Sequence, residues 1–277
     1  MVIITNRNEI KKARRIIIKI GTSTLINNNS FNSIFMENIA EQIKELRKQE
    51  KEVIIVASGA VGLGMHKSIS SNNHDTIIKQ CFASIGQNIM MRHITDCFSK
   101  HSMSVSQILV NHCDILGHEN KDIKNMINTL LEMKIIPIIN QNDAISKEEI
   151  TKYDNDTLSA NIGNLIDCDL LILLTDVDGL YKNIKTKELL HTVTRLNSDI
   201  YNCITLSSST LGRGGMQSKI NAAQIMKKDT IIVNGNSENI LMKILDGEKI
   251  GTHFSLNGGE TSEDWTNRIR KSWEIYN

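Results

Sequence analysis

Residues 15–57 read RIIIKI at 15–20 and VIIVA at 53–57, with a helical pattern between these two apolar runs. Four apolar residues of the middle segment recur at the spacing of one helix face: Phe35, Ile39, Ile43 and Leu46. Asn32 or Ser33 is a candidate helix cap. Strands that are apolar on both faces are typical of a parallel sheet covered on both sides. The stretch therefore predicts a strand, a helix and a second, parallel strand.

The same alternation continues along most of the chain. Apolar, β-branched runs predict further strands at 104–110, 134–139, 170–175 and 230–234. Helical patterns fit 76–99, 120–133, 157–166, 216–227 and 237–245. The polar segment from Lys182 to Arg213 is the least regular and predicts a flap or a small β excursion. We expect an α/β fold, a three-layer αβα sandwich with a mainly parallel central sheet, as a single domain over residues 1–277.

Composition narrows the class of protein. The chain has 32 Lys+Arg against 31 Asp+Glu, a formal net charge of +1, with 40% hydrophobic residues, which is ordinary for a globular protein. This balance favours neither a nucleic-acid nor a membrane partner. No apolar run approaches the roughly 20 residues that span a bilayer, and the N-terminal basic residues follow an apolar stretch, unlike a secretory signal. We expect a cytoplasmic protein whose five cysteines, which form no CxxC pair, are reduced.

Ligands of such sheets bind beyond the carboxyl ends of the strands. Four predicted strands are followed there by small, Gly-rich or polar segments: GTS (21–23), SGAVGLG (58–64), NQND (140–143) and TDVDG (175–179). Exposed backbone N–H groups in such segments suit phosphate. Lys19 ends an otherwise apolar strand, so it either reaches the surface or meets an anion. Lys219 closes the segment LGRGGMQSK (211–219), which is either a flexible linker or an oxyanion-binding turn before a helix. Together the two lysines predict a phosphate clamp.

Other motifs are incomplete. The segment 211–219 is not a Walker A loop, because GxxxxGK[ST] does not occur. Ser58 follows a strand as a nucleophilic serine would, but the GxSxG pattern needs glycine at Val56, and no histidine has a compelling position as its base. Asp154-Asn155-Asp156 and residues 176–179 do not complete a calcium-binding loop.

Taken together, the motifs resemble a known family. In chain order they are IIIKIGTSTL, VIIVASGAVGLGM, ASIGQ (83–87), IIPIINQNDAI, DNDTLSANIGNLIDCDLLILLTDVDGLY and LGRGGMQSKINAA. From about Arg14 to about Phe254 the chain is similar to the glutamate 5-kinases (γ-glutamyl kinases) of the amino acid kinase family. Many of those proteins carry a C-terminal PUA domain, and since this sequence stops at Asn277 we expect the short form without it.

The resemblance implies ATP-dependent phosphorylation of the side-chain carboxylate of L-glutamate to L-glutamyl 5-phosphate, the first step of proline biosynthesis. By the same resemblance, the catalytic residues are Lys19, Lys219 and Asp156, and the glutamate-binding residues are Ser58, Asp143 and Asn155. The implied ATP-binding residues are Lys19, Thr175, Asp176, Arg213, Gly214, Gly215, Met216, Gln217, Ser218 and Lys219. We expect Mg²⁺ to be held mainly by the nucleotide phosphates, with no dedicated protein metal site.

The resemblance also suggests a homo-oligomer, dimer or tetramer, inhibited by proline, with a glutamyl phosphate reductase acting downstream. Two alternatives stay open: another member of the amino acid kinase family that acts on a different small acid, and a non-catalytic amino-acid sensor on the same scaffold.

Four positions depart from the family pattern. Gln141 replaces a usual Glu, Tyr153 a usual Gly, and Arg213 and Ser218 each a usual Thr. None of these changes removes a residue on which the chemistry depends, so the expected reaction class is unchanged.

Overall fold

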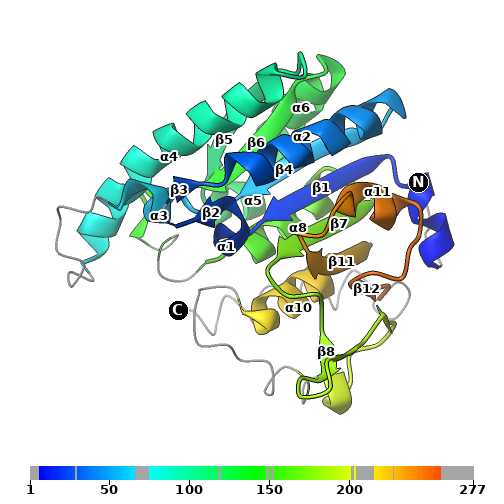
Figure 1. The fold of residues 1–277 in the computed structure, drawn as a ribbon. Coiled ribbons are helices and arrows are strands. Elements are labelled where there is room, and N and C mark those ends of the chain that lie inside the picture. The colour runs from blue at the N-terminus through cyan, green and yellow to red at the C-terminus, as the bar shows by residue number, and fades with distance from the viewer. Residues whose placement is uncertain are drawn as a thin grey trace.

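The centre of the fold is an eight-stranded sheet in the order β10-β12-β11-β7-β1-β4-β6-β5 (Figure 1). The computed structural model describes residues 6–28, 30–65, 75–117, 120–147, 150, 153–200, 203, 215–226 and 228–256. The strands are β1 (Arg15–Ile20), β4 (Glu52–Ala57), β5 (Val105–Val110), β6 (Ile136–Gln141), β7 (Leu170–Thr175), β10 (Thr192–Val193), β11 (Asp229–Asn234) and β12 (Thr252–Phe254). Neighbouring strands are parallel except for β11 and β12.

Helices cover both faces of the sheet (Figure 1). They are η1 (Arg7–Lys12), α1 (Thr22–Leu25), α2 (Ser33–Lys48), α3 (Ala60–Gly64), α4 (Thr76–Ser99), α5 (His112–Leu116), α6 (Asn120–Glu132), α8 (Asn155–Leu165), α10 (Met216–Ile225) and α11 (Ile240–Leu245). Two short hairpins, β2 (Ile26–Asn27) with β3 (Ser30–Phe31) and β8 (Tyr181–Asn183) with β9 (Glu188–Leu189), lie outside the main sheet. The structure confirms the three-layer αβα sandwich.

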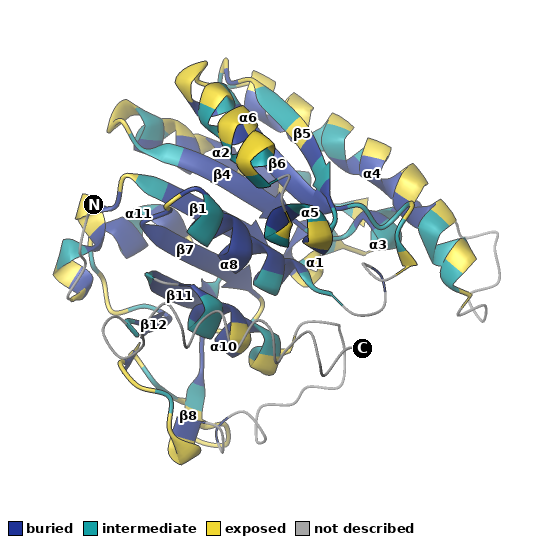
Figure 2. Ribbon diagram, turned by 180° about the vertical axis from the view of Figure 1, so that it is seen from behind, coloured by how far each residue is buried: buried dark blue, intermediate teal, exposed yellow. Residues whose placement is uncertain are grey.

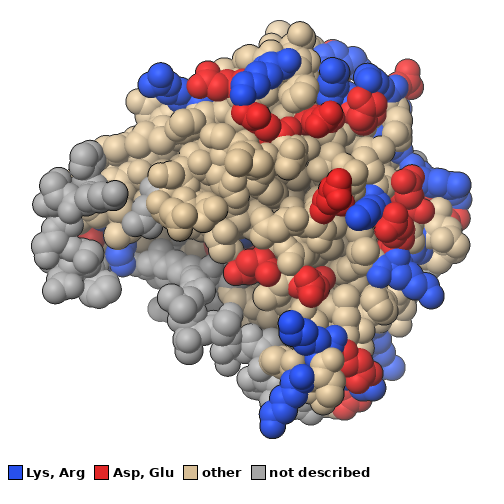
Figure 3. Space-filling view, in the orientation of Figure 1, with Lys and Arg blue, Asp and Glu red and all other residues tan. Residues whose placement is uncertain are grey.

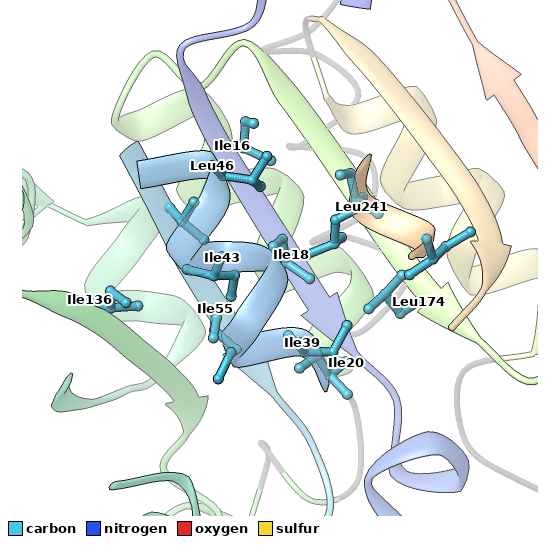
Figure 4. Packing of buried hydrophobic residues seen from close by; sticks show 14 of the residues in the cluster. Ile16, Ile18, Ile20, Ile39, Ile43, Leu46, Ile55, Ile136, Leu174 and Leu241 are labelled. Atoms are coloured by element: carbon cyan, nitrogen blue, oxygen red, sulfur yellow. The ribbon is translucent and has the colours of Figure 1, made fainter. Parts of the chain in front are cut away.

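The alternation of side chains along the central strands divides the core into two clusters. Ile16, Ile18 and Ile20 of β1 pack with α2, α4 and α11 on one face, and Ile17 packs with α6, α8 and α10 on the other. Figure 4 shows the first cluster, in which Ile39, Ile43 and Leu46 of α2 lie over β1. Each residue of β1 from Ile16 onward is buried (Figure 2), so the strand is covered on both sides as its apolar sequence requires.

The helix cap predicted before α2 is Asn32, whose side chain accepts a hydrogen bond from the Phe35 N–H at 3.2 Å. The irregular segment 182–213 contains the predicted β excursion, since β8 and β9 pair within 181–189. Within that segment, residues 201–202 and 204–213 lie outside the described part of the chain. The strands β10 and β12, at one end of the sheet, are too short to show an apolar pattern and were not predicted.

Surface charge is mixed on the face in Figure 3, where acidic and basic side chains are interspersed over the helices. This agrees with the near-zero net charge of the sequence. No helix among the described residues is long and apolar enough to cross a membrane. The five cysteines form no disulfide with one another.

Candidate functional site

A cavity of about 780 Å³ opens at the carboxyl ends of β1, β4, β6 and β7, where the sequence placed its Gly-rich and polar segments. The predicted site residues that line it are Lys19, Ser58, Asp143, Asn155, Asp156, Thr175, Asp176, Gly215, Met216 and Lys219. These residues are spread over most of the sequence. The sheet order brings them together because β7, β1, β4 and β6 are successive neighbours.

The centre of the cavity is a buried ion-pair triad of two lysines and one carboxylate. Lys19 Nζ lies 2.6 Å from Asp156 Oδ1, and Lys219 Nζ lies 3.2 Å from Asp156 Oδ2. Ser218 Oγ also donates a hydrogen bond to Asp156 Oδ2 at 2.9 Å. The three charged side chains come from the end of β1, the first turn of α8 and the first turns of α10. Two ammonium groups against one carboxylate leave a net positive charge at the base of the cavity, which suits an anionic ligand.

The environment of Asp156 keeps it ionised. Complete burial alone would raise the pKa of this carboxyl group, but the charges of Lys19 and Lys219, with hydrogen bonds from Lys19 and Ser218, outweigh it and hold the pKa below the usual range. A carboxylate that stays charged fixes both ammonium groups in place. The predicted role of Asp156, to orient the two lysines, therefore has a physical basis in the geometry.

Beside the triad, a chain of buried amide side chains connects Ser58 to helix α4. Asn155 Nδ2 donates to Ser58 Oγ at 2.9 Å and to Asn140 Oδ1 at 3.0 Å, and Asn140 Nδ2 donates to Gln87 Oε1 at 2.9 Å. The remaining oxygen of Asn155, Oδ1, is buried and has no partner among the described residues. A buried amide oxygen without a partner is costly, so it is well suited to accept a hydrogen bond from a ligand.

Asn140 and Gln87 were not assigned a role from the sequence. Both carried a signal, since Asn140 begins the NQND segment and Gln87 ends ASIGQ, but pattern alone does not show that the two side chains meet.

The wall beyond the amide chain is formed by the segment after β6 and by Tyr153. Gln141, Asp143 and Tyr153 all line the cavity. The ring of Tyr153 stacks on the ring of His112, with centroids 4.1 Å apart and planes 9° apart. Where the resemblance leads one to expect glycine, this chain therefore has an aromatic side chain that narrows the cavity and is held by a buried histidine.

The opposite end of the cavity is formed by the loop after β7 and the start of α10. Thr175 Oγ1 donates to Asp176 Oδ1 at 3.1 Å, and Gly215 and Met216 line the same wall. Gln217 does not line the cavity, because its side chain is turned along α10 and donates to Asn221 Oδ1 at 2.8 Å. Arg213 and Gly214 lie outside the described residues.

The glycines of SGAVGLG have different roles. Gly59 precedes α3 with φ of +115°, a conformation that other residues rarely adopt, and it lines the cavity. Gly64 does not line the cavity; a Cβ there would lie 1.9 Å from the Phe82 carbonyl oxygen of α4. A Cβ added at Gly86 would likewise lie 1.7 Å from the Ala60 carbonyl oxygen. Part of the motif that we interpreted as a phosphate-binding segment is thus a close helix contact.

Comparison with known proteins assigns a family to this geometry. The family model described as "Amino acid kinase family" matches residues 14–234. The chain belongs to the amino acid kinase family. A glutamate 5-kinase of Methanosarcina barkeri is 41% identical over 272 residues, covering 90% of this chain and 70% of the relative. A glutamate 5-kinase of Clostridium perfringens is 38% identical over 269 residues, covering 92% of this chain and 100% of the relative. The predicted resemblance is confirmed.

Two solved structures, both of UMP kinases, have the same fold as this chain. A UMP kinase from Bacillus anthracis has a TM-score of 0.62 and 16% sequence identity, covering 89% of this chain and 97% of that one. A UMP kinase from Ureaplasma parvum has a TM-score of 0.62 and 18% sequence identity, covering 88% of this chain and 99% of that one. At such identities the likeness shows the fold alone.

Proposed function

We propose that this protein is a glutamate 5-kinase, which transfers the γ-phosphoryl group of ATP to the side-chain carboxylate of L-glutamate. The products are L-glutamyl 5-phosphate and ADP, and the reaction is the first step of proline biosynthesis. The observation that carries the proposal is the triad of Lys19, Asp156 and Lys219, buried at the strand ends of an amino acid kinase fold. Support for the substrate comes from relatives named glutamate 5-kinase that match about nine-tenths of the chain.

The reaction needs charge compensation and no general base. The acceptor carboxylate has an unperturbed pKa near 4.3, so at neutral pH it is already the ionised nucleophile. One of its oxygens forms a bond to the γ-phosphorus while the bond from that phosphorus to the bridging oxygen breaks, and ADP leaves with the electron pair. Lys19 and Lys219 reduce the repulsion between the two anions and stabilise the charge on the transferring group. Asp156 keeps the ammonium groups at fixed positions during the transfer.

Glutamate binds at one end of the cavity and the nucleotide at the other. Asp143 has the charge to pair with the α-ammonium group of glutamate, and Ser58 and Asn155 offer neutral hydrogen bonds beside it. The buried Oδ1 of Asn155 then finds its partner in that ammonium group. Thr175, Asp176 and the start of α10 take the nucleotide, with Arg213 and Gly214 of the same segment assigned by resemblance. Ser218 acts indirectly, through its hydrogen bond to Asp156.

Mg²⁺ fits this site as an ion carried by the nucleotide. The central carboxylate, Asp156, has both oxygens engaged by lysines. The described residues contain no group of three or more His, Cys, Asp or Glu side chains that could hold a metal. When bound, Mg²⁺ supplies further charge neutralisation on the β- and γ-phosphates.

One assay tests the proposal. The purified protein is incubated with ATP, Mg²⁺ and L-glutamate in the presence of hydroxylamine, which converts an acyl phosphate to a hydroxamate. We expect hydroxamate formation with L-glutamate and not with aspartate or acetylglutamate. Hydroxamate from one of the other acids alone would assign a different acceptor within the family. No ADP formation with any of them would instead favour the amino-acid sensor.

Three further expectations stay predictions. Gel filtration tests the homo-oligomer, glutamate kinetics with added proline test the feedback inhibition, and coupled assays with a glutamyl phosphate reductase test the downstream partner. The single kinase domain over residues 1–277 is also a prediction.

A further inference from the structure

One charged group of L-glutamate has no partner in the site as described so far. The side-chain carboxylate faces the two central lysines and the α-ammonium group faces Asp143, which leaves the α-carboxylate. An anion taken from water into a cavity needs a cation or several hydrogen-bond donors to offset its lost hydration. If the proposed function holds, the α-carboxylate needs a cationic partner in this cavity. One lysine that the sequence motifs did not mark is available for that role.

Lys79 lies in the first turn of α4 and lines the cavity. The next residue, Gln80, donates from Nε2 to the carbonyl oxygen of Ala144 at 3.3 Å. Ala144 directly follows Asp143, so this hydrogen bond holds the start of α4 against the segment that carries the predicted ammonium ligand. The close contact between Gly64 and Gly86 fixes α4 against α3 on the other side. The position of Lys79 is therefore set by two independent contacts of its helix.

The sheet order places Lys79 on the amino-acid side of the triad. β1, which carries Lys19, lies between β7 and β4. The nucleotide end of the cavity comes from β7 and α10, on one side of β1. The elements around Lys79 come from the other side: α3 follows β4, and the segment with Asp143 follows β6. Lys79 is therefore separated from the nucleotide end by the strand that carries the reaction centre.

The charges of the cavity leave Lys79 without a partner. Among the described lining residues, three carry an ammonium group, and Lys19 and Lys219 are both engaged by Asp156. Lys79 makes no side-chain hydrogen bond or ion pair with any described residue. It is half-buried, so part of its side chain is shielded from water.

We propose that Lys79 binds the α-carboxylate of L-glutamate and makes the enzyme specific for acceptors that carry this group. The side chain acts on binding, because its helix lies on the β4 and β6 side of β1 and the nucleotide end of the cavity lies on the β7 side. Its removal should therefore raise the KM for glutamate and leave kcat nearly unchanged.

The test combines one substitution with one change in the substrate. L-Isoglutamine keeps the side-chain carboxylate of glutamate but has a neutral carboxamide in place of the α-carboxylate. With Lys79→Met we expect the KM for glutamate to rise about 10- to 100-fold, the range for losing a hydrogen bond to a charged group. The KM for isoglutamine should change by less than about threefold, because the contact is absent there in both proteins. Lys79→Arg should keep most of the preference for glutamate.

Arg92→Met is the matched control, since Arg92 lies exposed on the same helix outside the cavity. We expect wild-type kinetics for this variant with both acceptors, and thermal melting checks that each variant is folded. If the wild-type protein makes no hydroxamate from glutamate, the proposed function is wrong, and the role assigned to Lys79 is wrong as well. Active wild-type protein whose preference for glutamate over isoglutamine survives Lys79→Met would overturn the assignment of Lys79 alone.

Discussion

Replacing Asp156 by asparagine should destabilise the protein and make its stability depend on the nucleotide. Asparagine has nearly the same shape as aspartate but carries no charge. The change removes the negative charge that both buried lysines, 6% and 7% exposed, contact in the wild-type protein.

The two ion pairs of Asp156 set how much stability the substitution should cost. At an effective dielectric constant of about 20, contacts of 2.6 Å and 3.2 Å correspond to attractions of about 6 and about 5 kcal/mol. Most of that attraction offsets the lost hydration of the three charges, and removing one partner of a buried pair costs about 3–5 kcal/mol. At roughly 2–4 °C per kcal/mol for a domain of this size, the melting temperature should fall by about 6–20 °C.

The loss of stability in Asp156→Asn should depend on pH in a defined direction. The pKa of Asp156 is lowered in the folded protein, so its contribution is complete above the unfolded value of about 3.9. This contribution to stability is lost as the pH falls through the lower pKa that Asp156 has in the folded protein. The Asp156→Asn variant should therefore be less stable than wild type at neutral pH, and the difference should shrink in acid below about pH 4.

The nucleotide provides the decisive assay. Triphosphate binding places negative charge beside the lysines that have lost the Asp156 charge in the variant, so ATP with Mg²⁺ should raise the melting temperature of Asp156→Asn more than that of wild type. Asp154→Asn is the matched control, because Asp154 caps the same helix, where asparagine caps about equally well. Equal stabilisation of Asp156→Asn and wild type by ATP, or an Asp156→Asn variant as stable as wild type, would show that Asp156 does not stabilise the fold through its charge.

Further predictions concern catalysis, packing and thiol chemistry. Lys19→Ala and Lys219→Ala should each lower kcat by about 100-fold or more, measured as ADP release, and near-normal turnover would remove that lysine from the mechanism. Asp143→Asn should chiefly raise the KM for glutamate, and an unchanged KM would count against an ammonium contact. Gly86→Ala should destabilise the fold by about 1–3 kcal/mol in urea unfolding, since its Cβ would lie 1.7 Å from a backbone oxygen of α3; a neutral change would show that the two helices separate easily. Burial raises the pKa of Cys168 to about 12, so alkylation at pH 8 should label the two exposed cysteines and reach Cys168 only after denaturation.

The fold was largely predictable because its central strands are apolar on both faces. Residues 15–20 and 170–175 were predicted with the observed bounds, and α4 with both of its ends. The strands β10 and β12 escaped prediction because they are only 2 and 3 residues long and depend on pairing with distant parts of the chain. An apolar periodicity is visible only over several residues, and these two strands are too short to show one.

The site was predictable where a residue conflicts with its surroundings. Lys19 was visible because an ammonium group at the end of an apolar strand needs an anion, and the structure places Asp156 there. Lys79 has no such signal, since a lysine in the first turn of a helix is ordinary on a protein surface. Its significance arises only when Gln80 and Gly86 fix the helix against the cavity wall. Sequence therefore reveals the groups that the chemistry forces into the interior, whereas the residues that select the substrate depend on how separate elements pack around them.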